Sequence, residues 1–262
     1  MIGKKIRLNR LFNRSSKKIV IVPMDHGAYM GPLNGIENIE RTILSAYKGG
    51  ADAILINPGI MRFIPTNILG DISVILRITN TNIKSEIFPY EPVISSVSNA
   101  IKLGIDAIAF TVNIGGLQDL EGISQFGKVN DECNEFGIPL LGEFLPSGTK
   151  MADSFSPENV KFVARIASEL GADLIKTNYT GSPETFQEVT STALVPVVIA
   201  GGETMGTDRD VLLTIEGAMQ GGGAGICIGR NLWQRKNPRK MIELACKIVH
   251  EGTSVSEISD EL

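Results

Sequence analysis

Short apolar runs alternate with amphipathic stretches along the whole chain. Most of the apolar runs are continuous and rich in Val, Ile and Leu, which is typical of strands buried on both faces of a parallel sheet. The pattern predicts eight strands, at residues 18–24, 53–57, 73–78, 107–112, 139–145, 174–178, 197–200 and 225–229. It predicts helices between them, at residues 37–48, 95–103, 117–136, 157–170, 183–191, 208–219 and 237–250.

Turn signals support this alternation. Ser156 and Pro157 read as an N-cap and a first helical residue, and Gly171 as the stop of the same helix. Nearly the same phrase precedes three strands, as GGAD at 49–52, LGID at 103–106 and LGAD at 170–173, and GAG at 223–225 is a degenerate fourth copy. Repeated αβ units with eight evenly spread strands favour a closed (β/α)8 TIM barrel over an open doubly wound sheet.

We expect one α/β domain over residues 1–262, with an N-terminal extension at about 1–17 and a polar C-terminal tail at about 252–262. The tail is either loose or an interface helix, and residues 62–71 lack clear periodicity. The triple glycine at 221–223 precedes the last strand, so we interpret it as a turn at the opposite rim from the active-site loops.

Composition narrows the function classes. The 262 residues are 43% hydrophobic and 21% charged, as in globular proteins, and the net charge of −4 argues against a broad nucleic-acid surface. No apolar run approaches membrane-spanning length, and the basic N-terminus lacks a signal-peptide core. Three widely spaced cysteines indicate reduced thiols in a cytoplasmic protein, and two histidines exclude a three-histidine zinc site within one chain.

Polar residues gather where the expected strands end. Active sites of such barrels lie at the carboxyl ends of the strands, and charged groups inside apolar strands are costly without partners. Four charged residues fit this description, and their concentration at one rim is the main sign of an active site: Asp25, Arg77, Glu143 and Lys176. Polar neighbours at the same rim are candidate substrate-binding residues: His26, Asn57 and Asn178.

Lys176 is the strongest catalytic candidate. Strand alternation puts it on the same face as Leu174 and Asn178. If that face is the barrel interior, loss of water lowers the pKa of the amine, and a neutral lysine attacks a ketone to form a Schiff base. The alternative is a structural lysine paired with Asp25 or Glu143. We favour catalysis because a buried ion pair is an expensive way to gain stability.

The neighbouring ionisable groups each allow more than one role. Asp25 moves protons at the substrate, holds the protonation state of Lys176, or caps a turn before glycine. His26 is equally well a proton shuttle or a satisfied loop residue. Glu143 is either an acid/base group or a structural partner of Lys176 or Arg77.

The loops after the last two strands predict a phosphate site. Gly201 and Gly202 follow the seventh strand, and Gly229 and Arg230 follow the eighth. In this position backbone N–H groups and a short helix bind phosphate, and an arginine adds a charge-assisted contact. A phosphorylated small molecule is therefore the expected partner.

Five phrases carry a resemblance to a known family. They are GKKIRLNRLFNR at 3–14, VPMDHG at 22–27, IKTNYTG at 175–181, VIAGG at 198–202 and GRNL at 229–232. Through them the chain resembles, over nearly its whole length, the archaeal-type class I aldolases, also called the DhnA or DeoC/FbaB-like group. Within that family it looks most like the synthases of an alternative aromatic amino-acid route.

The resemblance implies residue roles as well as a reaction. Lys176 matches the Schiff-base lysine, Asp25 matches an aspartate implicated in proton transfer, and the glycines with Arg230 match the phosphate loops. It implies a (β/α)8 barrel that assembles into a homo-oligomeric ring or decamer, and it implies no metal or organic cofactor. The expected enzyme joins dihydroxyacetone phosphate or a deoxy-ketohexose phosphate to an aldehyde such as aspartate semialdehyde.

The chain departs from the family pattern at two positions. Leu145 stands where these enzymes usually carry an acid/base tyrosine, so we expect Glu143 to take over or the reaction to differ. Asn57 begins an Asn-Pro-Gly where the synthases tend to have His-Lys-Gly. Three alternatives follow: a fructose-bisphosphate aldolase, a thiolase acting on a phosphorylated dione, and a non-catalytic sugar-phosphate-binding protein.

Overall fold

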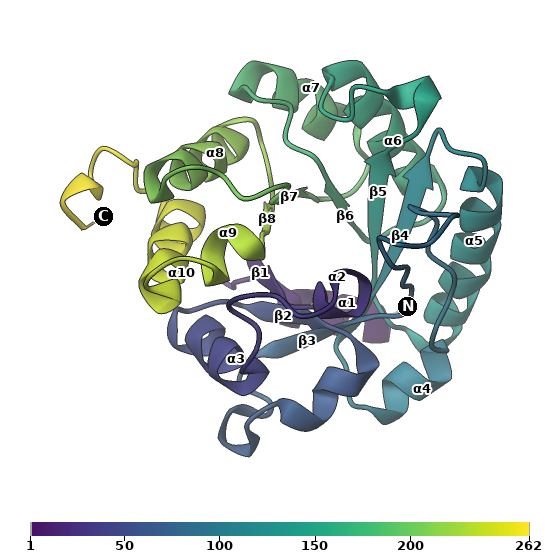
Figure 1. Ribbon diagram of the computed structural model, residues 1–262, viewed down its shortest axis with the longest axis horizontal. Coiled ribbons are helices and arrows are strands. Elements are labelled where there is room, and N and C mark those ends of the chain that lie inside the picture. Colours follow the sequence, from purple (N-terminus) through teal and green to yellow (C-terminus); the bar gives the residue numbers. More distant parts are fainter. Residues whose placement is uncertain (1, 262) are drawn as a thin grey trace.

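The computed structural model describes residues 2–261 and confirms the predicted barrel. All eight strands are parallel, and each pairs with its neighbours in chain order until β8 closes on β1 (Figure 1). The strands are β1 (Ile19–Pro23), β2 (Ala53–Ile56), β3 (Ser73–Arg77), β4 (Ala107–Ile114), β5 (Leu140–Pro146), β6 (Leu174–Thr177), β7 (Val197–Ala200) and β8 (Gly225–Cys227).

The seven predicted helices surround the barrel, with ends within a few residues of those expected. They are α3 (Ile39–Lys48), α4 (Val97–Lys102), α5 (Asp119–Phe136), α6 (Pro157–Glu169), α7 (Pro183–Thr192), α8 (Asp208–Gln220) and α10 (Pro238–Cys246). The last differs most, because residues 247–251 continue it as a π-helical turn. The predicted cap of α6 is present, since the Ser156 hydroxyl accepts a hydrogen bond from the Asn159 N–H.

Three helices were not predicted. They are α1 (Ile2–Leu11), within the expected N-terminal extension, and the four-residue helices α2 (Gly27–Met30) and α9 (Arg230–Trp233). The segment without clear periodicity, residues 62–71, overlaps two 3₁₀ turns, Pro58–Phe63 and Thr66–Ile68. A 3₁₀ or four-residue helix is too short to show a 3.6-residue pattern, so sequence periodicity could not find α2, α9 or the two turns.

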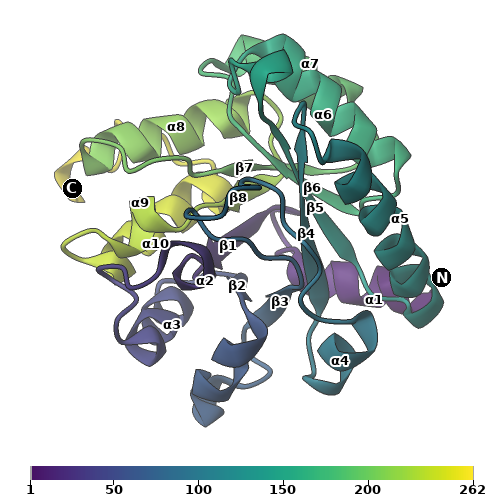
Figure 2. The same ribbon diagram turned by 45° about the vertical axis from the view of Figure 1, so that its right-hand side comes forward.

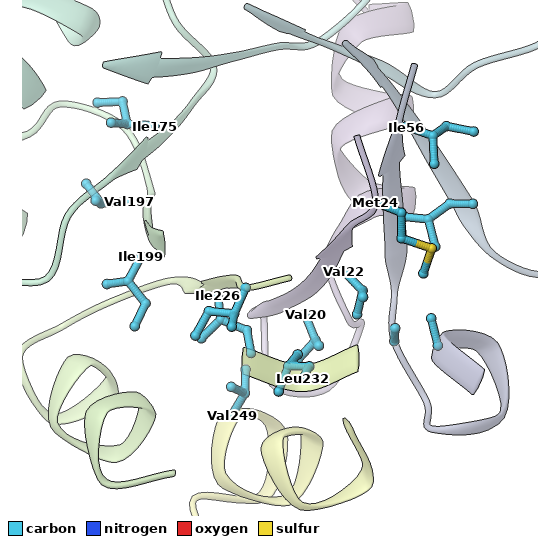
Figure 3. Packing of buried hydrophobic residues seen from close by; sticks show 14 of the residues in the cluster. Val20, Val22, Met24, Ile56, Ile175, Val197, Ile199, Ile226, Leu232 and Val249 are labelled. Carbon is cyan, nitrogen blue, oxygen red and sulfur yellow. The ribbon is translucent and has the colours of Figure 1, made fainter. Parts of the chain in front are cut away.

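Strand alternation sorts the apolar side chains into two layers. One layer, which includes Ile21, Leu55 and Leu174, fills the barrel interior. The other layer faces outward and packs against the helices. Figure 3 shows part of this outer layer, where Val20 and Ile226 lie near Leu232 of α9 and Val249. Because each strand is covered on both sides, its sequence is a continuous apolar run.

Helix α1 closes one end of the barrel. Leu8 and Leu11 of this helix pack against the interior layer, and Leu11 is fully buried. Polar contacts hold the helix in place, because Lys4 pairs with Asp173 at 2.8 Å and Arg7 donates to the Gly137 carbonyl at 3.0 Å. In Figure 2 the helix lies behind the strands, at the end opposite to α2. The open end of the barrel is therefore the end opposite to α1.

The repeated Gly-x-Asp phrase has a structural role at the closed end. Asp52 accepts a hydrogen bond from the Val20 N–H at 2.7 Å, which joins the turn before β2 to strand β1. The other two copies repeat this contact, with Asp106 bonded to Val74 and Asp173 bonded to Leu140, each at 2.9 Å. Each carboxylate thereby satisfies a strand N–H that has no ladder partner.

The fourth, degenerate copy of the phrase lacks the aspartate for a steric reason. Gly225 stands where the other copies have Asp, and its φ is +145°. A Cβ at this position would lie 1.9 Å from the Ile19 carbonyl oxygen, so only glycine allows β8 to approach β1. The triple glycine before it forms the expected turn, with Gly222 at φ +83°.

The C-terminal segment packs on the barrel, so the expectation of a loose tail is wrong, while an interface role for this segment stays a prediction. Val255 and Ile258 are buried in the outer apolar layer, and Glu261 pairs with Lys240 and Lys247. Two apolar residues in a polar stretch were too weak a signal to indicate docking. Within residues 2–261, no helix is both long and apolar enough to cross a bilayer. The homo-oligomer and the cytoplasmic location stay predictions.

Replacing Asp106 by alanine should lower the free energy of unfolding by about 2 kcal/mol, because the buried Val74 N–H loses a charged acceptor. Asp131→Ala is the control, since Asp131 is exposed on α5 and should cost under about 0.5 kcal/mol. Urea unfolding followed by circular dichroism measures both. Equal midpoints for the two variants would contradict a stabilising role for the repeated aspartate.

Candidate active site

Strand register brings the charged residues to one level of the barrel interior. Glu143 of β5 pairs in register with Lys176 of β6 on one side and with Thr111 of β4 on the other. Alternation along β6 points Lys176 inward with Leu174, as predicted, and away from the outward-facing Ile175. These side chains lie at the carboxyl end of the strands, opposite to α1.

A buried ion cluster joins these groups. The Lys176 Nζ lies 2.6 Å from Glu143 Oε1, and Arg77 donates from Nη2 to the other oxygen of the same carboxylate. Arg77 also donates to Asp25 through Nε and to Thr111 through Nη1. The exposed fraction of each of these five residues is 7% or less, so the charges interact in a site with little water.

Glu91 completes the cluster and was missed by the sequence reasoning. It lies in the loop between β3 and α4, where it accepts hydrogen bonds from Arg77 Nη1 at 3.2 Å and from Thr79 Oγ1 at 2.9 Å. Three carboxylates thus surround the two cations Arg77 and Lys176. Glu91 stands 14 residues after Arg77, the last residue of β3, in a segment without a strand or helix pattern. Nothing in the sequence therefore indicated that this loop returns to the barrel.

The environment of Lys176 differs from the expectation. Burial of the amine favours its neutral form, but the acidic groups beside it, Cys227 and Glu143, outweigh burial and hold the pKa of Lys176 above its ordinary value. The carboxylate is the neighbour that carries a charge, because burial raises the pKa of the Cys227 thiol to about 12. Lys176 therefore rests as an ammonium, and the predicted fall of its pKa is wrong.

The pKa values of the two glutamates of the cluster are shifted in opposite directions. Burial favours the neutral form of Glu143, yet Lys176 and Arg77 outweigh burial and lower the pKa of Glu143 to about 2. Burial raises the pKa of Glu91, which receives less compensation from Arg77 and is repelled by Glu143. Glu143 is therefore a carboxylate, while Glu91 is the member of the cluster that most readily holds a proton.

The structure gives Arg77 and His26 supporting positions. All three guanidinium nitrogens of Arg77 are engaged by the cluster, which favours an organising role over substrate binding. His26 Nδ1 lies 3.4 Å from Asp25, and the ring packs edge-on against Trp233. Burial lowers the pKa of His26 to about 4, against the attraction of Asp25, so the imidazole is neutral.

Two rim amides bind neighbouring backbone. Asn57 donates to the Asp25 carbonyl at 2.7 Å, which fixes the end of β1 against the end of β2. Its own Oδ1 is buried without a partner among the described residues. Asn178 donates to the Ser154 carbonyl at 2.8 Å and thereby holds the loop after β5. Their expected contacts with substrate stay predictions.

The predicted phosphate loops lie side by side. Arg230 donates to the Gly202 carbonyl at 2.8 Å, across the gap between the loops after β8 and β7. Asn231 strengthens this connection by donating to the carbonyls of Gly201 and Glu203, each at 2.8 Å. Asn231 follows Arg230 directly, but an asparagine at the start of a short helix gave no sequence signal of this role.

Glycine is required in these loops by close packing. A Cβ on Gly229 would lie 2.7 Å from the His26 ring and 2.8 Å from the Pro23 carbonyl oxygen. A Cβ on Gly201 would lie 2.9 Å from Ile228. The α9 helix begins directly after Gly229, so its first turn lies at this loop. The phosphate role of the two loops stays a prediction.

Comparison with known proteins decides the family. The family model described as DeoC/LacD family aldolase matches residues 19–235. The chain belongs to this aldolase family. An uncharacterized aldolase of Saccharolobus solfataricus is 34% identical and aligns over 98% of each chain. A 2-amino-3,7-dideoxy-D-threo-hept-6-ulosonate synthase of Halobacterium salinarum is 34% identical over 95% of this chain and 92% of that protein.

A solved structure adds the reaction class. This aldolase superimposes with a TM-score of 0.88 and 29% identity on an archaeal fructose-1,6-bisphosphate aldolase, over 94% of this chain and 99% of that chain. The catalytic lysine of that enzyme was captured bound to the carbinolamine intermediate of its substrate. The protein is therefore an enzyme of the class I aldolase type.

The change in the free energy of unfolding at acid pH should reveal the stabilising charge of Glu143. Since its pKa is lowered from 4.5 to about 2, its stabilising effect is complete above pH 4.5 and is lost as the pH falls towards 2. Glu143→Gln should cost about 3 kcal/mol at pH 7, because two buried cations lose their shared carboxylate. This difference from the unsubstituted protein should shrink between pH 4.5 and 2 in urea unfolding.

Glu188→Gln is the matched control, because Glu188 forms an exposed pair with Lys161 at 3.1 Å. That substitution should change the free energy of unfolding by under about 1 kcal/mol at every pH. A Glu143→Gln effect as small as the control, or one that persists at pH 2, would show that Glu143 is not a stabilising carboxylate.

Proposed function

We propose that this aldolase joins a phosphorylated ketone donor to an aldehyde through an iminium on Lys176. The observation that carries the proposal is the Lys176–Glu143 pair, 2.6 Å apart and buried at the open end of the barrel beside the loops after β7 and β8. A lysine amine in reach of a carboxylate and of an anion-binding loop has the groups that a Schiff-base aldolase needs.

Glu143 is the group that frees the lysine for attack. Transfer of a proton from the Lys176 ammonium to this carboxylate, against the resting preference of the pair, gives the amine that adds to the donor carbonyl. The nitrogen loses two protons in all, one through Glu143 and one from the adding amine; both leave with the carbonyl oxygen as water, which restores the Glu143 carboxylate and leaves a positively charged iminium. The carboxylate then stabilises this cation, just as it stabilises the ammonium in the free enzyme.

The same carboxylate takes part in the next step. The iminium draws electrons from the neighbouring C–H bond, and Glu143 takes that proton to give the enamine that attacks the aldehyde. Asp25 holds Arg77 in place by accepting its hydrogen bond, and it takes part in proton transfer at this end of the barrel. Glu143 thus takes the acid/base role that Leu145, which follows it on β5, lacks the chemistry to perform.

The donor phosphate is assigned to the paired loops. Gly202 is exposed there and Gly201 is partly exposed, Gly229 is buried beneath them, and Arg230 brings a positive charge that bridges the two loops. Dihydroxyacetone phosphate or a deoxy-ketohexose phosphate would place its carbonyl towards Lys176 from this anchor. The acceptor we propose is aspartate semialdehyde, in keeping with the similarity to the Halobacterium synthase, whose named product is an amino-substituted ulosonate.

Cleavage of fructose bisphosphate is the second candidate. The similarity to an archaeal fructose-1,6-bisphosphate aldolase with an intermediate on its lysine favours it. The two candidates share the donor half of the site and differ in the aldehyde half. Product analysis with fructose bisphosphate, and with dihydroxyacetone phosphate plus aspartate semialdehyde, distinguishes them.

Borohydride trapping tests the proposal. Incubation with dihydroxyacetone phosphate, fructose bisphosphate or a deoxy-ketohexose phosphate, followed by reduction, should leave a stable adduct on the peptide that contains Lys176, because reduction makes the iminium permanent. Peptide mass spectrometry locates the adduct, and the ligand that labels best identifies the donor.

Lys176→Met should abolish the adduct. Lys161→Met should leave it unchanged, because Lys161 lies in an exposed pair on α6. An adduct on another lysine, or none with any of the three ligands although they bind, would overturn the assignment of Lys176.

A further inference from the structure

The proposed carbon–carbon step needs a neutral proton donor at the open end of the barrel. When the enamine attacks an aldehyde, negative charge develops on the aldehyde oxygen and must be neutralised. At this stage the lysine nitrogen belongs to the enamine, Glu143 holds the donor proton deep in the barrel beside Arg77, and the neutral imidazole of His26 is a weak acid. An O–H group at the mouth of the site is then the donor placed where the aldehyde enters.

Three of the four tyrosines lie outside the barrel. The Tyr47 hydroxyl is 3.4 Å from Asp71, and the Tyr90 hydroxyl accepts a hydrogen bond from Gln125 of α5. Tyr179 packs against Phe186 of α7. None of these phenols faces the ion cluster.

Tyr29 is held at the mouth. It belongs to α2, which Figure 1 shows in front of strands β1 and β2 at the open end. Its ring packs against the His26 ring, with centroids 5.7 Å apart, and its carbonyl accepts a hydrogen bond from the Ile83 N–H at 3.0 Å. The β3–α4 loop makes a second bond to this helix, from Asn80 to the Ala28 carbonyl at 3.2 Å. The backbone of α2 around Tyr29 is therefore held by two hydrogen bonds from the β3–α4 loop.

The phenol of Tyr29 remains available for a substrate. The side chain is half-buried, and its hydroxyl makes no hydrogen bond with any residue that the structure describes. Burial raises the pKa of Tyr29 to about 12, with Asp25 adding to the shift and with Lys176 and Arg230 opposing it. The phenol therefore stays protonated at neutral pH, and its ring lies beside His26, whose Nδ1 is 3.4 Å from Asp25.

We propose that Tyr29 is a catalytic residue that donates its phenolic proton to the aldehyde oxygen. As the new C–C bond forms, the aldehyde π electrons move to oxygen, which takes the Tyr29 proton, and solvent reprotonates the phenolate. In cleavage the same phenolate removes the proton from the hydroxyl group. This assignment rests on the proposed aldol function, and it concerns the aldehyde half of the reaction only.

Two assays separate the halves of the reaction in Tyr29→Phe. Exchange of the donor C–H into D₂O with dihydroxyacetone phosphate requires the iminium and the enamine but no aldehyde, so its rate should stay within twofold. Condensation with glyceraldehyde 3-phosphate or aspartate semialdehyde, whichever the unsubstituted enzyme uses, should fall about 100-fold. Tyr47→Phe, the same change far from the mouth, should alter neither rate.

The outcomes distinguish the two proposals. Condensation within twofold in Tyr29→Phe, or an equal loss of exchange and condensation, would overturn the role of Tyr29 and leave the aldol function intact. No exchange and no borohydride adduct in the unsubstituted enzyme would overturn the aldol function itself.

A second variant keeps the test decisive if Tyr29→Phe does not fold. Incorporation of 2,3,5-trifluorotyrosine at position 29 retains the ring and hydroxyl but makes the phenol more acidic. Condensation should then decline at a lower pH than in the unsubstituted enzyme, because the donor loses its proton earlier. A pH profile identical to that of the same replacement at Tyr47 would overturn the proposal.

Discussion

The pairing of two buried cations with three carboxylates is the constraint on which the active end of the barrel depends. Arg77 and Lys176 lose their water when the barrel closes, and either alone would be too costly to bury. Arg77 resolves this by binding Asp25 of the β1 end, Glu143 of β5 and Glu91 of the β3–α4 loop. Segments far apart in the sequence are thereby fixed around one guanidinium.

The same pairing of charges also sets the protonation state of Lys176. Because Glu143 carries a charge next to the amine, Lys176 rests as an ammonium whose proton has an acceptor 2.6 Å away. The resting ion pair and the iminium both place a positive nitrogen beside the carboxylate, so the cluster need not rearrange when the intermediate forms. Preorganisation of this kind is a property of the cluster rather than of Lys176 alone.

Sequence periodicity predicted the elements that lie in the barrel wall and missed those that close it. Buried strands leave continuous apolar runs, and the Gly-x-Asp turns repeat, so the eight strands and their order followed directly. Helix α1 was missed because its apolar residues are few, although Leu8 and Leu11 plug the barrel interior. The short helices α2 and α9 carry too few residues for any period to appear.

The candidate site shows a similar division. Strand alternation correctly brought Lys176 and Glu143 to the interior, because that inference needs only the strand and its direction. Glu91 and Tyr29 come from loops, whose course depends on tertiary contacts that no local pattern records. The pKa of Lys176 was wrongly predicted for the same reason, since burial and a neighbouring carboxylate act in opposite directions and only the structure shows the neighbour.

The protonation state of Lys176 is the most direct test of this account. Lysine labelled with ¹³C at Cε reports the charge of each amine by NMR, and Lys176→Met assigns the resonance. In the free enzyme the Lys176 signal should stay that of an ammonium to a higher pH than the surface lysines, and in Glu143→Gln it should titrate at a lower pH. A Lys176 that titrates below the surface lysines in the unsubstituted enzyme would contradict the account.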